Sequence, residues 1–124
     1  MIALDSCVLV DFFSAAPSPE RENARELIKN RVAVIAPATL TELLSDPKGG
    51  RAVAAILDEF AMLPLTDGYW ERAGHLRAKV RQAGRKAALG DALIAQACID
   101  SDVALLTRDD DFAAYVKLGG LKLA

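Results

Sequence analysis

Four acidic residues, Asp5, Glu42, Asp91 and Asp109, carry the chemistry that this 124-residue sequence suggests. Carboxylates brought within a few ångströms raise one another's pKa, so a shared pocket needs a cation between them. Oxygen ligands favour Mg²⁺ or Mn²⁺, whereas zinc is usually held by His or Cys, and His75 is the single histidine. A divalent ion held in this way activates a bound water and binds a phosphodiester oxygen. We therefore expect phosphodiester hydrolysis.

Short apolar runs alternate with helical patterns along the chain, which is typical of a parallel sheet. The runs cover residues 2–4, 33–36, 62–65, 103–106 and 121–123. Helices are expected over 7–13, 20–30, 38–45, 67–84, a segment that opens at Asp91, and the run between Gly49 and Phe60. The sequence thus predicts a single α/β domain over residues 1–124, a three-layer α/β/α architecture with a short, mainly parallel sheet of about five strands.

The carboxyl edge of this sheet is where the four acids are expected to meet. In right-handed βαβ units each helix begins near the carboxyl ends of the strands, where open α/β folds place their sites. Asp5 ends the first strand, Asp109 follows the fourth, and Asp91 starts the helix that leads into it. Glu42 lies early in the helix after the second strand, flanked by leucines, which predicts a partly buried carboxylate in need of a partner.

Each acid also has a structural alternative, because Asp is a favoured N-cap and stabilises helix starts. Asp109 or Asp110 could cap the last helix, and the run 109–111 could be solvated surface. All four acids together are poorly explained by capping, so we favour the site. Neighbouring residues at a strand end point to alternate sides, so Asp109 and Asp111 are expected to face the pocket and Asp110 to face away.

The net charge of −2 argues at first against a nucleic-acid partner, since affinity for phosphate comes largely from Lys and Arg. Without the four acids, however, the rest of the chain carries +2, and residues 72–86 hold six basic residues and no acid. This segment is either the solvated face of an amphipathic helix or a track for RNA. The candidates for RNA contact are Arg77, Arg81, Arg85 and Lys86.

The remaining features indicate an ordinary globular protein. A composition of 52% hydrophobic and 26% charged residues, with no basic leader ahead of an apolar run, predicts a cytoplasmic protein without a signal peptide or membrane span. Cys7 and Cys98 lack metal-ligand spacing and are expected to be buried thiols. Tyr69 and Trp70 could stack on bases, but we favour packing in the core for both.

Four motifs in this order resemble those of PIN domains. Their spacing and the total length are similar in particular to the VapC-type toxins of toxin–antitoxin pairs, and the resemblance covers essentially the whole chain. The motifs are Leu4-Asp5-Ser6, Thr41-Glu42-Leu43, Gly90-Asp91-Ala92-Leu93-Ile94-Ala95 and Leu106-Thr107-Arg108-Asp109-Asp110-Asp111-Phe112.

The resemblance implies a metal-dependent endoribonuclease, usually a homodimer, that leaves a 5′-phosphate and is held inactive by a small VapB-like antitoxin. It places Mg²⁺ or Mn²⁺ at the four acids, with Asp111 as a further acidic ligand and with Ser6 and Thr107 as supporting hydroxyl residues. Residues 84–89 depart from the family's Arg/Pro-rich approach to the third acid, which weakens any inference about which RNA is cut.

The segment from Cys7 to Phe13 is apolar nearly all round a short helix. Such a helix either packs against a second helix or exposes a patch for a partner, and we expect a mixture of the two. An antitoxin could lie along it and reach an Arg or Lys into the acidic pocket. The residues expected to contact it are Val8, Leu9, Phe12 and Phe13.

Three other functions compete with RNA cleavage. A structure-specific DNA nuclease of PIN type would keep the fold, but its larger insertions are missing here. A receiver-like Mg²⁺-binding signalling module expects its acceptor Asp after the third strand, where residues 62–67 match poorly. A non-catalytic binding partner is the third alternative. Mg²⁺-dependent RNA cleavage that EDTA abolishes would separate the first function from the rest.

Overall fold

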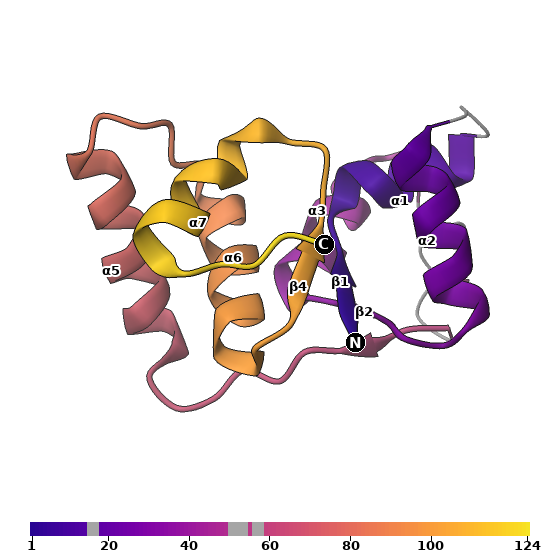
Figure 1. The fold of residues 1–124 in the computed structure, drawn as a ribbon, viewed down its shortest axis with the longest axis horizontal. Helices are drawn as coiled ribbons and strands as arrows, with labels where there is room; N and C mark the ends of the chain where they lie inside the picture. The colour runs from indigo at the N-terminus through magenta and orange to yellow at the C-terminus, as the bar shows by residue number, and fades with distance from the viewer. Residues whose placement is uncertain (15–17, 50–54, 56–58) are drawn as a thin grey trace.

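A computed structural model of the chain describes residues 1–14, 18–49, 55 and 59–124. The predicted helical run between Gly49 and Phe60 lies largely outside these residues. Figure 1 shows the arrangement of the elements. In chain order they are β1 (Ile2–Leu4), α1 (Ser6–Ser14), α2 (Pro19–Lys29), β2 (Ala33–Ile35), α3 (Pro37–Leu44), β3 (Ala61–Met62), α5 (Tyr69–Gln82), α6 (Leu89–Ser101), β4 (Ala104–Leu106), the 3-10 helix η1 (Asp110–Phe112) and α7 (Ala113–Gly119).

The sheet has four parallel strands in the order β3-β2-β1-β4. The third strand is shorter than expected, covering only Ala61–Met62 ahead of Leu63, whose N–H donates to the Ile35 carbonyl at 2.9 Å. The predicted fifth strand is reduced to a parallel bridge between Leu105 and Leu123, held by hydrogen bonds of 2.9 Å from Leu105 N to Lys122 O and from Ala124 N to Leu105 O. The mainly parallel sheet is therefore confirmed, with its outermost member as a bridge.

Alternate residues of each strand face the two helical layers, as the pleat of a strand requires. Ala3, Val34 and Leu105 pack in one core with side chains of α5, α6 and α7. Leu4, Ile35 and Leu106 pack in a second core with side chains of α1, α2 and α3. Figure 1 accordingly shows α5, α6 and α7 on one side of the strands and α1 and α2 on the other, which confirms the three-layer α/β/α architecture.

Helix α1 is more deeply buried than expected. Val8 and Leu9 have no exposed surface and belong to the second core. The expectation that they contact an antitoxin is wrong, because α1 packs against α2 and α3, and Val8 and Leu9 lie in the core that these helices form with the sheet. Val10 is 53% exposed, Phe12 is partly buried, and the side chain of Phe13 lies outside the described part of the chain.

Two further expectations concern the cysteines and membranes. Cys98 is a fully buried free thiol as predicted, while Cys7 is also free but only partly buried. Among the described residues, no helix combines the length and the apolar character needed to cross a bilayer.

Candidate active site

The carboxyl ends of β1 and β4 bring the predicted acids to one edge of the sheet. Asp5 directly follows β1, and its backbone N–H donates to the Leu106 carbonyl at 3.0 Å. Asp109 follows β4 in the chain, and Asp91 lies in the first turn of α6. Glu42 reaches the same place from α3, since a Cβ atom added at Gly90 would lie 3.4 Å from its carboxyl group.

Three of the acids form a tight group. Asp91, Asp109 and Asp111 each offer a carboxylate oxygen within 4.8 Å of the others. Asp5 and Glu42 are not members of this group among the described residues, but both act on Asp91 electrostatically. The structure thus divides the predicted set into a central triad and two flanking carboxylates.

Asp91 is the electrostatic centre of the site. Its pKa is raised from an ordinary 3.8 to about 7, first by burial and then by Asp109, Asp5, Glu42 and Asp111 in that order. The residue Glu42 is exposed overall, yet the pKa of its carboxyl group is also raised, first by partial dehydration and then by Asp5 and Asp109. A cluster of oxygen donors that cannot all ionise without a cation is a donor set suited to Mg²⁺ or Mn²⁺.

The run 109–111 combines a structural role with a place in the triad. Asp109 is the N-cap of η1, because its Oδ1 accepts the Asp111 N–H at 2.9 Å. This turn places Asp109 and Asp111 in the acidic group, while Asp110 is exposed and is not in the group among the described residues. The expected division therefore holds, although a 3-10 turn produces it and not the alternation of a strand.

Asp5 is almost fully buried and is held by three donors. Thr107 Oγ1 donates to Asp5 Oδ2 at 2.7 Å, and the Ser6 N–H donates to Oδ1 at 2.8 Å. Thr107 Oγ1 also accepts the Asp109 N–H at 3.0 Å, so one hydroxyl couples two of the predicted acids. The third donor, Cys7 Sγ at 3.3 Å from Oδ2, was missed, because its apolar neighbours indicated only burial.

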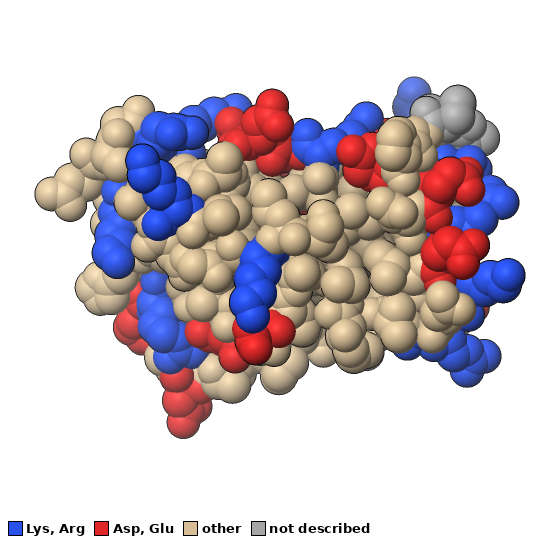
Figure 2. All heavy atoms as spheres, viewed as in Figure 1, with Lys and Arg blue, Asp and Glu red and all other residues tan. Residues whose placement is uncertain are grey.

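The loop between α5 and α6 brings a basic residue to the acids. Lys86 Nζ lies 3.3 Å from Asp111 Oδ2, and the Arg77 Nε–H donates to the Ala87 carbonyl at 2.8 Å, which holds the loop in place. Arg81 and Arg85 are exposed, as a contact with RNA requires. In Figure 2, acidic atoms at the upper edge of the molecule have basic atoms on both sides.

An apolar pocket of about 300 Å³ adjoins the acids, since Glu42 and Gly90 both line it. Tyr69, also in its lining, is buried as expected, with its hydroxyl donating to the Leu93 carbonyl at 2.6 Å. Trp70 is 64% exposed, so the expectation that it packs in the core is wrong. Successive residues of a helix point about 100° apart, and Tyr69 takes the inward position.

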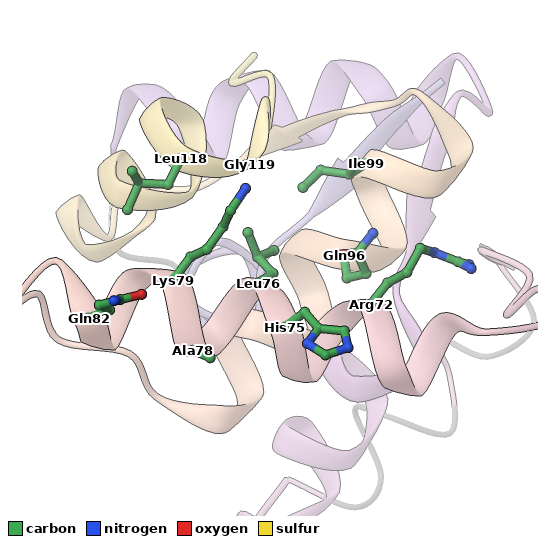
Figure 3. A pocket seen from close by; sticks show the side chains of 10 residues that line it. All are labelled: Arg72, His75, Leu76, Ala78, Lys79, Gln82, Gln96, Ile99, Leu118 and Gly119. Atoms are coloured by element: carbon green, nitrogen blue, oxygen red, sulfur yellow. The ribbon is translucent and has the colours of Figure 1, made fainter.

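A second pocket of about 560 Å³ lies between α5, α6 and α7. Figure 3 shows Lys79 and Arg72 beside an apolar floor that includes Leu76 and Ile99. Arg72 is already paired with Asp100 at 2.7 Å. This pocket is lined by the second half of α6, whereas Asp91 lies in its first turn, so it is separate from the acidic site.

Comparisons with known proteins agree with this fold. The profile of the PIN domain family matches residues 2–118. The structure of VapBC2 from Rickettsia felis bound to a promoter DNA fragment superposes with a TM-score of 0.76 at 24% identity, covering 100% of this chain and 98% of that chain. VapBC-1 from nontypeable Haemophilus influenzae superposes with a TM-score of 0.74 at 18% identity, covering 100% of this chain and 97% of that chain. FitAcB from Neisseria gonorrhoeae superposes with a TM-score of 0.72 at 21% identity, covering 99% of this chain and 96% of that chain. Comparison with curated proteins finds no match.

Proposed function

The chain belongs to the PIN domain family, and from this membership we propose that it is a metal-dependent endoribonuclease, the toxin of a VapBC-like type II toxin–antitoxin pair. The observation that carries the proposal is the triad of Asp91, Asp109 and Asp111, whose carboxylate oxygens lie within 4.8 Å of one another. The pKa of Asp91 is raised to about 7, first by burial and then by the four other acids. Such a cluster is stable in its ionised form only with a cation, and metal-assisted hydrolysis is the chemistry that follows.

Mg²⁺ or Mn²⁺ at these five carboxylates would supply an activated water and charge stabilisation on the scissile phosphodiester. The residues of the chain prepare this site. Thr107 and the Ser6 N–H orient Asp5, and the cap at Asp109 fixes Asp111. Oriented ligands keep the geometry that a small, rigidly coordinated cation demands.

RNA is the proposed substrate because exposed basic residues lead to the acids. Arg81 and Arg85 lie at the end of α5 and in the loop that follows, and Lys86 reaches Asp111. Phosphate contacts of this kind supply most of the affinity for a single-stranded nucleic acid and position it without reading its sequence.

The test is cleavage of total RNA by the purified protein with Mg²⁺ or Mn²⁺, followed by mapping of the new ends. We expect products with 5′-phosphates that disappear with EDTA and with Asp5→Asn, which preserves shape but removes a charge. Asp110→Asn is the matched control and should cleave like the parent. Cleavage that persists in EDTA, or preference for a DNA flap over RNA, would contradict the proposal.

We also propose an antitoxin partner. The similar structures from Rickettsia felis and Haemophilus influenzae are described as VapBC, and one from Klebsiella pneumoniae as a toxin–antitoxin complex. Because Val8 and Leu9 are buried, the partner would meet α1 at Val10, and it would inhibit by placing an Arg or Lys among the acids.

Val10→Asp is therefore expected to weaken capture of a VapB-like partner by roughly 10-fold or more, because a charge in an apolar contact is costly. Binding and inhibition would be measured with the co-expressed partner, after circular dichroism confirms the fold. Val116→Asp, at an exposed valine of α7, is the control. If Val10→Asp is bound and inhibited like the parent, the partner lies elsewhere.

A homodimer is proposed through the apolar pocket beside Glu42. Trp70 is 64%, Leu89 60% and Leu65 38% exposed, and all three line this pocket. Apolar side chains that adjoin in this way are typical of a surface that another protein covers, and a two-fold dimer presents the same patch twice.

Trp70→Glu is expected to convert the dimer into a monomer, since buried aromatic residues dominate such interfaces. Molar mass measured by light scattering over a range of concentrations checks this. Ala78→Glu adds the same charge to an exposed position of the same helix and should stay dimeric. A parent protein that is monomeric throughout the range would overturn the proposal.

A further inference from the structure

One buried acid takes no part in the metal site described above. Asp11, on α1, is 6% exposed, and Arg108 Nη2 lies 2.8 Å from its Oδ1. Arg108 itself is only partly covered, since 47% of its side chain remains exposed. An ion pair with one partner exposed contributes little net stability, so stability alone does not explain this arrangement.

Arg108 lies at the acidic edge because it follows the carboxyl end of β4 in the chain. It lies between Thr107, which holds Asp5, and Asp109 of the triad. Its contact with Asp11 draws the side chain toward α1, whereas Lys86 approaches the triad from the loop between α5 and α6. Figure 1 shows α1 and that loop on opposite sides of the carboxyl ends of β1 and β4. The two cations therefore border the acids on two sides.

We propose that Arg108 binds a backbone phosphate of the RNA next to the scissile one, and that Asp11 is the positioning residue that holds its guanidinium ready. This inference rests on the proposed function. A guanidinium has five N–H donors in a fixed fork, so one edge can stay on Asp11 while another edge donates to two phosphate oxygens. Holding it in advance lowers the entropy lost on binding, and its positive charge draws RNA toward an otherwise acidic edge.

The direction in which Asp11→Asn changes RNA affinity distinguishes this positioning role from a simple charge effect. Asp11→Asn removes a negative charge near the RNA, which by bulk electrostatics should tighten binding. If Asp11 positions Arg108, the same change should weaken binding, because the guanidinium is no longer held. In the Arg108→Gln background Asp11 no longer has this guanidinium to position, so adding Asp11→Asn should be neutral or should tighten binding. This is a double-mutant cycle with opposite predictions for the two arms.

The experiment measures fluorescence anisotropy of a labelled 20-nucleotide single-stranded RNA of mixed sequence, in EDTA, over a range of salt concentrations. We expect Arg108→Gln to bind about 5–10-fold more weakly and to lower the salt slope by about 0.7, the value for one phosphate contact on a single strand. Arg108→Lys should keep the slope but lose affinity, because an ammonium cannot bind in the bidentate manner. Arg25→Gln, at an exposed position of α2, is the matched control for loss of one charge.

Arg108→Gln removes a partner of the buried Asp11 and is the variant most exposed to loss of stability, whereas Asp11→Asn keeps Arg108 and the double variant removes both charges of the pair. Thermal unfolding of each variant gives the check. Tighter binding by Asp11→Asn in the parent, or an equal loss in Arg108→Gln and Arg25→Gln, would overturn the inference. A parent protein that neither binds nor cleaves RNA would instead overturn the proposed function, so the two failures are distinguishable.

Discussion

Asp91→Asn is expected to reduce metal-dependent RNA cleavage by more than about 100-fold. Loss of a residue that only supports a metal ligand commonly costs 10–100-fold, and Asp91 would be a ligand itself. It is the acid on which the other four act, in the first turn of α6. The measurement is the initial cleavage rate at saturating Mg²⁺, with Asp110→Asn as the control that removes one charge from the same edge.

The same substitution should make the metal-free protein more stable at neutral pH and above. The pKa of Asp91 is raised from 3.8 to about 7 in the folded chain, so the folded state favours the protonated form. The stability that protonated Asp91 contributes is therefore complete below about pH 4 and is lost as pH rises through about 7. Urea unfolding in EDTA should show a decline in stability between these values that is smaller in Asp91→Asn.

Both outcomes are needed, since activity and stability should change in opposite directions. A variant that loses activity because it is misfolded would also lose stability, and saturating Mg²⁺ would not stabilise it. If Asp91→Asn cut RNA at near the parent rate, the metal site would be wrong. If the parent showed no decline between pH 4 and pH 8, the carboxylate repulsion described for the site would be wrong.

The positions of the acids could be predicted because strand direction decides them. Asp5, Asp91 and Asp109 each lie where a strand ends or a helix begins, and parallel strands carry such residues to one edge whatever their side-chain environment. The order and direction of the strands were therefore enough to predict where these three acids lie. The division into a triad and two flanking carboxylates could not be predicted, because it depends on the 3-10 turn at Asp109 and on the depth of α6.

Burial on α1 and at the start of α5 was harder to predict. The residues from Cys7 to Phe13 are apolar almost all round the helix, so no periodicity indicates which face packs inward. In the structure Val8 and Leu9 are the residues buried in the core. Tyr69 and Trp70 are adjacent aromatic residues of similar hydrophobicity, and only the rotation of α5 sends one inward and the other outward. Such choices depend on how neighbouring elements pack.

The contact between Asp11 and Arg108 also depends on how neighbouring elements pack and could not be predicted from the sequence. The two residues are far apart in the sequence, and neither spacing nor periodicity connects them. In the sequence Asp11 is only a charged residue within the apolar segment 7–13. Only the placement of α1 beside the end of β4 turns it into a buried acceptor for an arginine at the acidic edge.

Thr107→Val is expected to cost 10–100-fold in Mg²⁺ affinity or cleavage rate, the usual effect of losing an outer partner of a metal ligand. Valine keeps the shape of threonine but removes both the donor to Asp5 Oδ2 at 2.7 Å and the acceptor of the Asp109 N–H at 3.0 Å. The carboxylate and the N–H would be left to find other partners, so two acids lose their orientation at once. The Mg²⁺ concentration that gives half-maximal cleavage is the quantity to measure.

Two matched variants make this prediction specific. Thr107→Ser retains the hydroxyl and should stay within about 3-fold of the parent, because the donor and the acceptor are preserved. Cys7→Ala removes only a weak thiol donor, at 3.3 Å from the same oxygen of Asp5, and should cost less than Thr107→Val. The order Thr107→Val, then Cys7→Ala, then Thr107→Ser follows from the strength and number of hydrogen bonds lost. An equal effect of Thr107→Ser and Thr107→Val would show that the methyl packing of residue 107 matters and that its hydroxyl does not.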